Sequence, residues 1–454
     1  MTNANIRAEQ RNNIANWHSR GLFYCGMALM IASIFARNIL DISIPVIAVL
    51  AIGALTALIA TREEMIALII ACIPMSAGFQ YKYLIFVCIV IYAVRFYKDI
   101  KFNSAILPLL FMMVWDLIHG IFYPFALSEF LRGFAELIFC TFLMLIIPKK
   151  IDYKLISRLL AISSICMMLI VLLNLLEQTN YNFEEIFVGT YRFGVGDADV
   201  KNYGVNYNAN ALGLIANLSI AGLLQLIVAK KHNFFDFLLI VILVMFGVMT
   251  MSRSFLICLA LIVAMFAVSG VPTLKEKLKR LFLIALVIVL LVTLVLALIP
   301  NVYETFAARF EVDDVTNGRS DLFAFYMDHL LSSPKHLLLG VGRQGYGNII
   351  ADMYTGVLVG GDTEMNVCHN GTQELLVCWG LPGLVLLVWF IFELIRKKPQ
   401  GLKREITNYI PLVLLLIYVQ AGQLITGGMP MLAFSFAYVS LCYDFSGGKN
   451  EKNS

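Results

Sequence analysis

The sequence has little charge. Only 14% of its 454 residues are Asp, Glu, Lys or Arg and 60% are apolar, whereas about a quarter of an average soluble domain is charged. A single aqueous globule could not bury that much apolar surface, and a disordered chain would be more polar. The net charge of +4 is small, and no stretch concentrates it into a basic face, which excludes a nucleic-acid binder. A polytopic membrane protein remains.

Residues that form disulfides or bind metals are also scarce. Of the nine cysteines, only Cys368 lies in a long connection; the others lie within or at the ends of apolar runs. The six histidines include no spaced pair such as H-E-x-x-H. We therefore expect no disulfide framework, no metal site and no cofactor.

Long apolar runs are abundant. A transmembrane helix needs about 20 mostly apolar residues, and fourteen runs reach or approach that length. None alternates at every second residue, as the strands of a membrane barrel do, so helices are expected. The runs lie near residues 21–36, 40–60, 64–79, 83–97, 105–123, 131–148, 155–176, 208–229, 236–251, 254–270, 281–299, 372–395, 408–426 and 429–444. The predicted fold is an all-α membrane bundle of about 14 transmembrane helices.

The distribution of positive charge sets the direction of these helices. With the N-terminus in the cytoplasm, most of the 34 Lys and Arg residues fall on the cytoplasmic side, and the C-terminus does as well. The predicted organisation is helices 1–7 in residues 1–176, an external loop in 177–207, helices 8–11 in 208–299, a large external loop in 300–371, and helices 12–14 with a cytoplasmic tail in 372–454.

The large external loop has signs of a folded cap. Gly318-Arg319-Ser320-Asp321 is typical of a helix start, and helical spacing continues to Leu331 before Ser333-Pro334 ends it. Gly340-x-Gly342-x-x-Gly345 matches a dinucleotide-binding string, but no βαβ unit surrounds it, so a turn is expected. The bundle is therefore predicted to carry a partly helical cap on its outer face.

A few basic residues and one histidine are predicted to lie on the outer side, so the excess of Lys and Arg in cytoplasmic segments does not explain their presence. Arg253 is wedged between two apolar runs, where it either snorkels to the interface or binds an anion such as phosphate. The same question applies to Arg192 and Arg319. His369 closes the large loop just before an apolar run, where an imidazole has the pKa for proton transfer near neutral pH.

These motifs occur in a specific order over roughly residues 190–385. The series is Arg192-Phe193-Gly194, Asn208-Ala209-Asn210, Ser252-Arg253, Gly318-Arg319, Leu339-Gly340-Val341-Gly342, His369-Asn370 and Gly380-Leu381-Pro382-Gly383. In the order of these motifs and in the predicted membrane side of each, the sequence resembles the superfamily of bacterial O-antigen ligases and O-antigen or capsule polymerases. It is more similar to the Wzy-type polymerases.

The resemblance implies an inverting, metal-independent glycosyltransferase whose donor is a glycan on undecaprenyl pyrophosphate. In family terms Arg253, Arg319 and, more weakly, Arg192 bind the pyrophosphate, while His369 activates the acceptor hydroxyl. Weaker substrate or sugar contacts are assigned to Asn208, Asn210, Asn370 and Arg343. The implied location is the bacterial inner membrane, with a periplasmic cap and active site.

A polymerase and a ligase share this chemistry and differ in the acceptor. A polymerase extends a second carrier-linked repeat unit, whereas a ligase transfers the glycan to lipid A-core. Many ligases have an acidic residue directly after the His-Asn pair, and Gly371 stands here. The interpretation therefore favours an O-antigen or capsule polymerase of lipopolysaccharide or polysaccharide biosynthesis. Its expected partners are the carrier-linked donor and acceptor, membrane lipid, a chain-length regulator and a flippase.

A flippase or transporter for lipid-linked sugars is the alternative from a different class. Asp116 and His119 in one apolar run, and Gln420 and Gln423 in another, are the polar groups that favour it. A hydrogen-bonding role inside the bundle explains them more simply.

Overall fold

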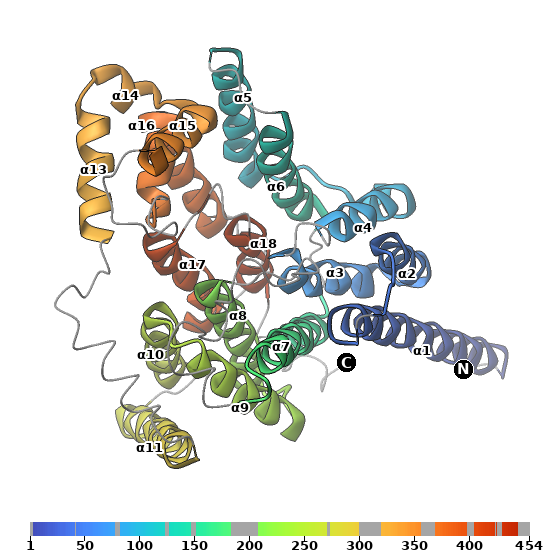
Figure 1. Cartoon of the computed structure of the whole chain (residues 1–454). Helices are drawn as coiled ribbons and strands as arrows, with labels where there is room; N and C mark the ends of the chain where they lie inside the picture. The colour runs from blue at the N-terminus through green and yellow to red at the C-terminus, as the bar shows by residue number, and fades with distance from the viewer. Residues whose placement is uncertain are drawn as a thin grey trace.

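The computed structural model describes residues 3–40, 42–77, 82–122, 127–146, 151–182, 208–269, 273–298, 319–355, 368–396, 404–422, 424 and 429–443. Within these ranges the chain is helical and contains no strand. The principal helices are α1 (Asn3–Ile39), α2 (Val46–Ile59), α3 (Arg62–Ala71), α4 (Lys82–Arg95), α5 (Leu107–Phe122), α6 (Leu127–Ile146), α7 (Tyr153–Gln178), α8 (Ala209–Val228), α9 (Phe234–Met249), α10 (Arg253–Val268), α11 (Leu274–Leu298), α13 (Arg319–Leu331), α14 (Pro334–Leu339), α15 (Gly342–Thr355), α16 (Gly371–Arg396), α17 (Ile410–Ala421) and α18 (Met429–Leu441). Their arrangement is shown in Figure 1.

The all-α prediction is confirmed, and each of the fourteen apolar runs overlaps one of these helices. In the part of the chain that the structure describes, five segments are long and apolar enough to cross a membrane: Arg20–Ile39, Ser104–Ile121, Tyr153–Gln178, Ala209–Val228 and Gly371–Arg396. Several further apolar helices have only 10–17 residues. The chain is thus a multi-pass membrane protein, and the number of fourteen spans stays a prediction.

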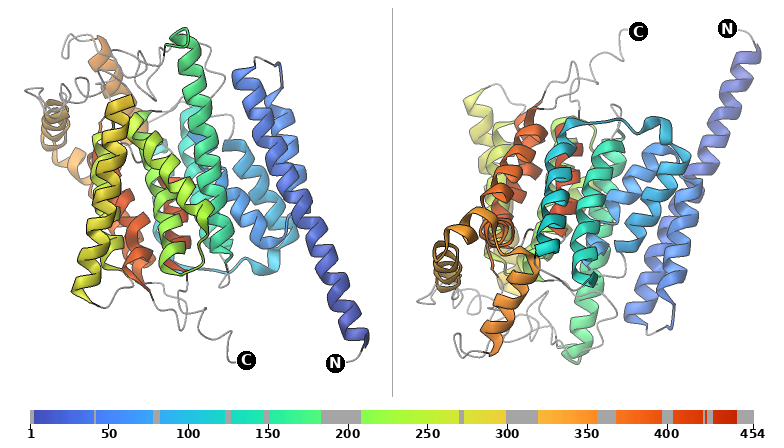
Figure 2. Two further views of the ribbon diagram at one scale, coloured as in Figure 1. Left: turned by 90° about the horizontal axis from the view of Figure 1, so that it is seen from below. Right: turned by 90° about the horizontal axis from the view of Figure 1, so that it is seen from above.

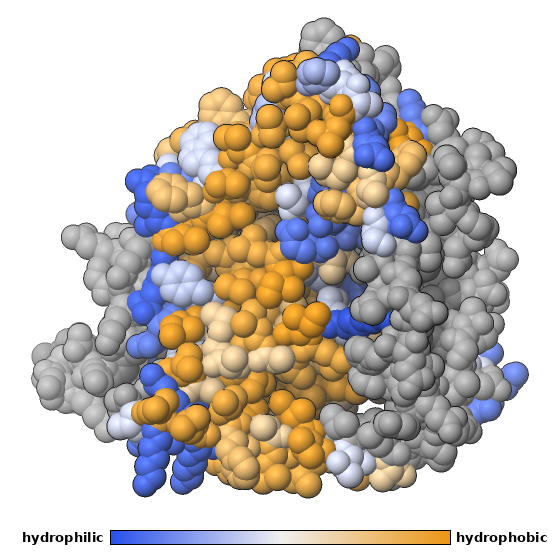
Figure 3. All heavy atoms as spheres, turned by 90° about the vertical axis from the view of Figure 1, so that its left-hand side faces the viewer, coloured by the Kyte–Doolittle hydropathy of each residue, from blue (hydrophilic) through white to orange (hydrophobic). Residues whose placement is uncertain are grey.

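The surface carries an apolar band. Figure 3 shows this band running across one face of the molecule, with hydrophilic residues along its edges. Large apolar side chains of α11 contribute to the exposed surface; Phe282 is 67% exposed and Leu290 60%. A continuous apolar surface of this kind is stable in contact with lipid and not with water.

One end of the bundle collects arginines that cap helix ends. Arg95 donates to the carbonyl oxygens of Ala57 and Ala60 at the end of α2. Arg280 donates to the carbonyls of Phe266 and Ser269 at the end of α10. Cations are stabilised there because the last carbonyls of a helix lack partners and carry partial negative charge. These arginines belong to the side predicted as cytoplasmic, and α1 projects beyond the bundle toward that end in Figure 2.

The opposite end holds the starts of three helices that carry motif residues. The ends of α8 and α10 meet the segment before α17, because Gln225 donates to the Thr407 carbonyl and Ser269 to the Thr407 hydroxyl. The starts of α8 and α10 and the end of α17 therefore lie at the opposite end of the bundle. Asn370, just before α16, hydrogen-bonds Gln420 near the end of α17, which brings the start of α16 to the same end. Figure 2 shows α13–α15 toward this end as well.

Candidate functional site

His369 and Asn370 lie in the short segment that leads into α16. Both side chains are half-buried. The Asn370 side chain accepts a hydrogen bond from the backbone N–H of Gln373 at 2.9 Å, as a helix-capping residue does. Its amide donates to Oε1 of Gln420 at 3.3 Å, and Gln420 in turn donates to Thr372. The His-Asn pair is thus fixed at a helix N-terminus, where the backbone dipole favours negative charge.

Buried groups hold the residue directly before His369. The backbone N–H of Cys368 donates to the phenol oxygen of Tyr346 on α15 at 2.7 Å. Burial raises the pKa of the Cys368 thiol to about 12, so the thiol keeps its proton at neutral pH. It donates to Oε1 of Gln373 at 3.0 Å, and Nε2 of Gln373 donates to the carbonyl of Phe323 on α13 at 2.7 Å. The segment before α16 is therefore bonded to both α13 and α15.

Sequence reasoning missed Tyr346 and Gln373. Gln373 follows Asn370 at the spacing of a capping box, in which the third helical residue supports the cap, and that spacing was a usable signal. Tyr346 gave no such signal, because its partner Cys368 is 22 residues further along the chain.

Arg253 is the first residue of α10 and is half-buried. Its neighbours Ser252 and Ser254 both donate to Oδ1 of Asn210 on α8, at 2.7 and 3.4 Å. Asn208 caps α8 by accepting from the backbone N–H of Asn210 at 2.8 Å. The structure therefore brings the predicted Asn208-Ala209-Asn210 and Ser252-Arg253 motifs together.

The side chains of the other two predicted pyrophosphate ligands lie outside the described part of the chain. Arg319 is the first residue of α13, as the sequence predicts, and its side chain lies outside the described part of the chain. Arg192 also lies outside the described residues.

Arg343 sits apart from the His-Asn pair, in contact with the membrane bundle. Its Nε donates to Oδ1 of Asp116 on α5 at 3.0 Å, and the two side chains are only 12% and 3% exposed. The indole N–H of Trp379 donates to the same oxygen at 2.9 Å, and the Arg343 guanidinium lies over the Trp379 ring, 5.4 Å from its centre. The arginine assigned to a sugar contact thus has a buried partner within the protein.

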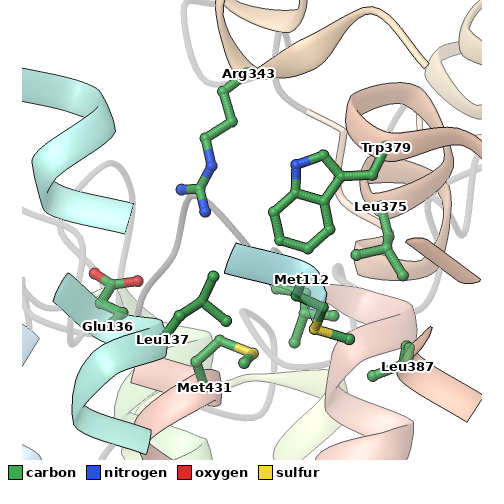
Figure 4. Close-up of a pocket in the computed structure, with 9 residues that line it drawn as sticks. Met112, Glu136, Leu137, Arg343, Leu375, Trp379, Leu387 and Met431 are labelled. Carbon is green, nitrogen blue, oxygen red and sulfur yellow. The ribbon is translucent and has the colours of Figure 1, made fainter. Parts of the chain in front are cut away.

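Arg343 and Trp379 also line a small pocket between α5, α6, α16 and α18. Figure 4 shows the guanidinium and the indole on one side, with Glu136 and apolar side chains such as Met112 and Met431 around the rest. The free space is about 10 Å³, room for roughly one water molecule. It is too small for a sugar.

The polar residues of α5 have the bundle-facing role that the sequence favoured. Asp116 accepts from Arg343 and Trp379. His119 is buried and hydrogen-bonds the backbone of Leu339 at the end of α14. These contacts join α5 to α14 and α15, which explains why polar groups are present in an apolar run.

The site has a simple set of chemical groups. An imidazole, a helix N-terminus and the arginine that begins α10 are all at the end of the bundle opposite the arginine-capped helix ends. Together they can accept a proton from a hydroxyl and stabilise an anion. Among the described residues, no three His, Cys, Asp or Glu side chains are grouped as metal ligands.

Comparison with known proteins agrees with the motifs. The family model described as O-antigen ligase matches residues 238–388. That range starts within α9, ends within α16, and includes Arg253, Arg319, Arg343 and His369. No curated protein matches the chain significantly. The protein is therefore a multi-pass membrane protein in which residues 238–388 match the O-antigen ligase family.

Proposed function

We propose that the protein is a membrane glycosyltransferase that polymerises undecaprenyl-pyrophosphate-linked repeat units into O-antigen or capsular polysaccharide. The observation that carries the proposal is the O-antigen ligase match over Arg253, Arg319 and His369. The reaction takes place at the outer face of the inner membrane, and both chain termini are cytoplasmic. A flippase delivers the donor, and a chain-length regulator acts on the product.

The proposed reaction needs a base and cations only. A hydroxyl of the acceptor sugar attacks the anomeric carbon of the donor from the side opposite the pyrophosphate. His369 takes the hydroxyl proton as the new C–O bond forms. The bond between the anomeric carbon and the pyrophosphate oxygen breaks, and undecaprenyl pyrophosphate leaves with inversion at carbon. Arg253 and Arg319 stabilise the charge that develops on the leaving group, and Arg192 assists them.

The remaining motif residues support this site. Asn210 fixes the two serines beside Arg253, Asn208 caps the adjacent helix, and Asn370 caps α16 beside His369. We propose that the three principal side chains converge in one cavity open to the outer leaflet, since α10 and α16 begin at the same end of the bundle.

Gly371 favours a polymerase over a ligase. A Cβ at this position would lie 2.8 Å from Cβ of Leu424 and 2.9 Å from Cγ1 of Val419. The acidic residue that many ligases place after the His-Asn pair therefore has no room here. Ligase activity remains the second candidate, because the matching family is described as O-antigen ligase.

The acceptor requirement separates these functions. Purified protein is incubated with one carrier-linked repeat unit and no lipid A-core. A ladder of longer carrier-linked glycans supports the polymerase, and transfer that starts only after lipid A-core is added supports the ligase. No glycan transfer to either acceptor, together with movement of the substrate across proteoliposomes, would instead identify a flippase.

A further inference from the structure

The first half of α16, residues 371–379, is attached to α15 at both of its ends. We call it the leading segment. It follows directly after His369 and Asn370 and ends just before Gly380, where the helix is kinked. Two residues of α15 contact its ends, Tyr346 before the start and Arg343 near the kink. They are three positions apart in the sequence and so lie on the same side of α15.

At the start, Tyr346 fixes the backbone. Its side chain is 1% exposed, and its phenol oxygen accepts the N–H of Cys368. The Tyr346 ring packs on Tyr326 of α13, with ring centres 5.8 Å apart. Because a buried backbone N–H without a partner costs free energy, this hydrogen bond favours one position of the residue before His369.

At the kink, Asp116 joins three helices. One carboxylate oxygen accepts from Arg343 of α15 and from the Trp379 indole of α16. The Trp379 carbonyl accepts from the indole of Trp115, the neighbour of Asp116 on α5. The end of the leading segment is therefore bonded to the bundle through its side chain and its backbone.

Two glycines bring the chains into direct contact at this point. Gly340 and Gly380 have φ angles of +75° and +66°. A Cβ on Gly340 would lie 2.6 Å from the backbone of Cys378, and one on Gly380 would lie 2.7 Å from the backbone of Leu338. The N–H of Val341 donates to the carbonyl of Val377 at 2.8 Å. The start of α15 cannot shift along α16 without breaking this crossing.

We propose that Arg343 and Tyr346 are positioning residues that hold the leading segment, and with it His369, in the orientation required for glycosyl transfer. Asp116 and Trp379 are the partners of Arg343 at the kink, and the Cys368 N–H is the partner of Tyr346. The inference rests on the proposed function for its effect on activity, while the anchoring itself is a property of the fold. It gives Arg343 a role other than a sugar contact, because the arginine is nearly buried beside a pocket with room for about one water molecule.

A double-mutant cycle on the buried pair tests the kink contact. Removing one partner leaves the other charge buried and unpaired, whereas removing both leaves no such charge. Arg343→Gln and Asp116→Asn are therefore each expected to lower kcat by roughly tenfold or more, with KM for the carrier-linked unit nearly unchanged. Asp116→Asn/Arg343→Gln should be more active than either single variant. A double variant no more active than Arg343→Gln, with a raised KM, would mean that Arg343 contacts substrate and would overturn the proposal.

Tyr346→Phe tests the other end, with Tyr92→Phe as its matched control. Tyr92 is equally buried, and its hydroxyl contacts the Ile146 carbonyl at the opposite end of the bundle. Hydrogen exchange of the Cys368 amide should accelerate at least tenfold in Tyr346→Phe and stay unchanged in Tyr92→Phe. Glycan transfer should fall in Tyr346→Phe only. Unchanged exchange at Cys368 in folded Tyr346→Phe would refute the positioning role.

The exchange measurement separates this inference from the proposed function. If the wild-type protein transfers no glycan to any acceptor, the proposed function fails, yet exchange at Cys368 still reports whether α15 anchors the leading segment. If glycan transfer is observed and the cycle is strictly additive, the positioning inference fails and the function stands.

Discussion

At the scale of single residues, His369 is distinguished by its surroundings. It follows a buried cysteine that makes three hydrogen bonds through its N–H and its thiol, and it precedes the helix-capping residue Asn370. This fixes the backbone on both sides of the imidazole, and catalysis by proton transfer requires such fixed geometry.

Replacing His369 by Ala should abolish polymer formation while the protein still inserts and folds. The expected loss is at least about a hundredfold, the usual contribution of a general base. His232→Ala is the matched control, because His232 is exposed and only packs edge-on against Phe237. Glycan length on gels is measured for both, normalised to folded protein. Wild-type chain lengths in His369→Ala would contradict the assigned role.

A second residue-scale prediction concerns the stacked pair His329 of α13 and His336 of α14. Their rings are 4.7 Å apart and nearly parallel. Burial lowers the pKa of His329, and the neighbouring His336 lowers it further. With a folded pKa below the unfolded value of about 6.5, His329 contributes stability above that pH, and the contribution is lost as the pH falls through the folded pKa.

Protection of α13 amides from hydrogen exchange should therefore decrease between about pH 7 and pH 5 after correction for intrinsic rates. His336→Asn removes the second charge and should make the decrease smaller. Protection that rises as the pH falls would show that the sign of this coupling is wrong.

At the scale of elements, the crossing of α14–α15 with α16 depends on glycine. Gly380→Ala should destabilise the protein by about 1–3 kcal/mol, because alanine must adopt a positive φ and its Cβ would meet the backbone of Leu338. Gly347→Ala is the control: its Cβ meets nothing within 4 Å and it lies inside α15, so helix propensity favours the change. Thermal unfolding in detergent measures both. Equal melting temperatures would contradict the close crossing.

The elements also show how far sequence reasoning reaches. The apolar run at residues 236–251 predicted α9, which is found at Phe234–Met249. The helix-start motif Gly318-Arg319-Ser320-Asp321 predicted α13 at its observed start. Such signals are local. The partnership of Asp116 with Arg343 joins residues 227 positions apart, and no local pattern encodes it. For the same reason, the family resemblance assigned Arg343 a weak sugar contact without revealing its buried partner.

At the scale of the whole molecule, the two ends of the bundle differ in chemistry. Arginines cap helix ends at one end, and the starts of α8, α10 and α16 with their motif residues lie at the other. The excess of Lys and Arg that predicts the topology also accounts for this separation, because basic side chains are stabilised at the C-terminal ends of helices. The arginine-capped end is the one predicted to be cytoplasmic.

Single cysteines in a cysteine-free background test this topology. Phe323→Cys on α13, where the side chain is 45% exposed, should react with an impermeant maleimide in intact spheroplasts. Lys231→Cys, exposed in the connection between α8 and α9, should react only after the membrane is opened. The reverse pattern would place the candidate site in the cytoplasm and exclude a periplasmic reaction.

The most direct test of glycosyl transfer counts undecaprenyl pyrophosphate released against glycosidic bonds formed, using purified protein and one carrier-linked repeat unit without lipid A-core. The polymerase account predicts one carrier released for each new linkage, inverted stereochemistry at the new bond, and neither product in His369→Ala. Release of carrier without a new linkage, or no release at all, would contradict it.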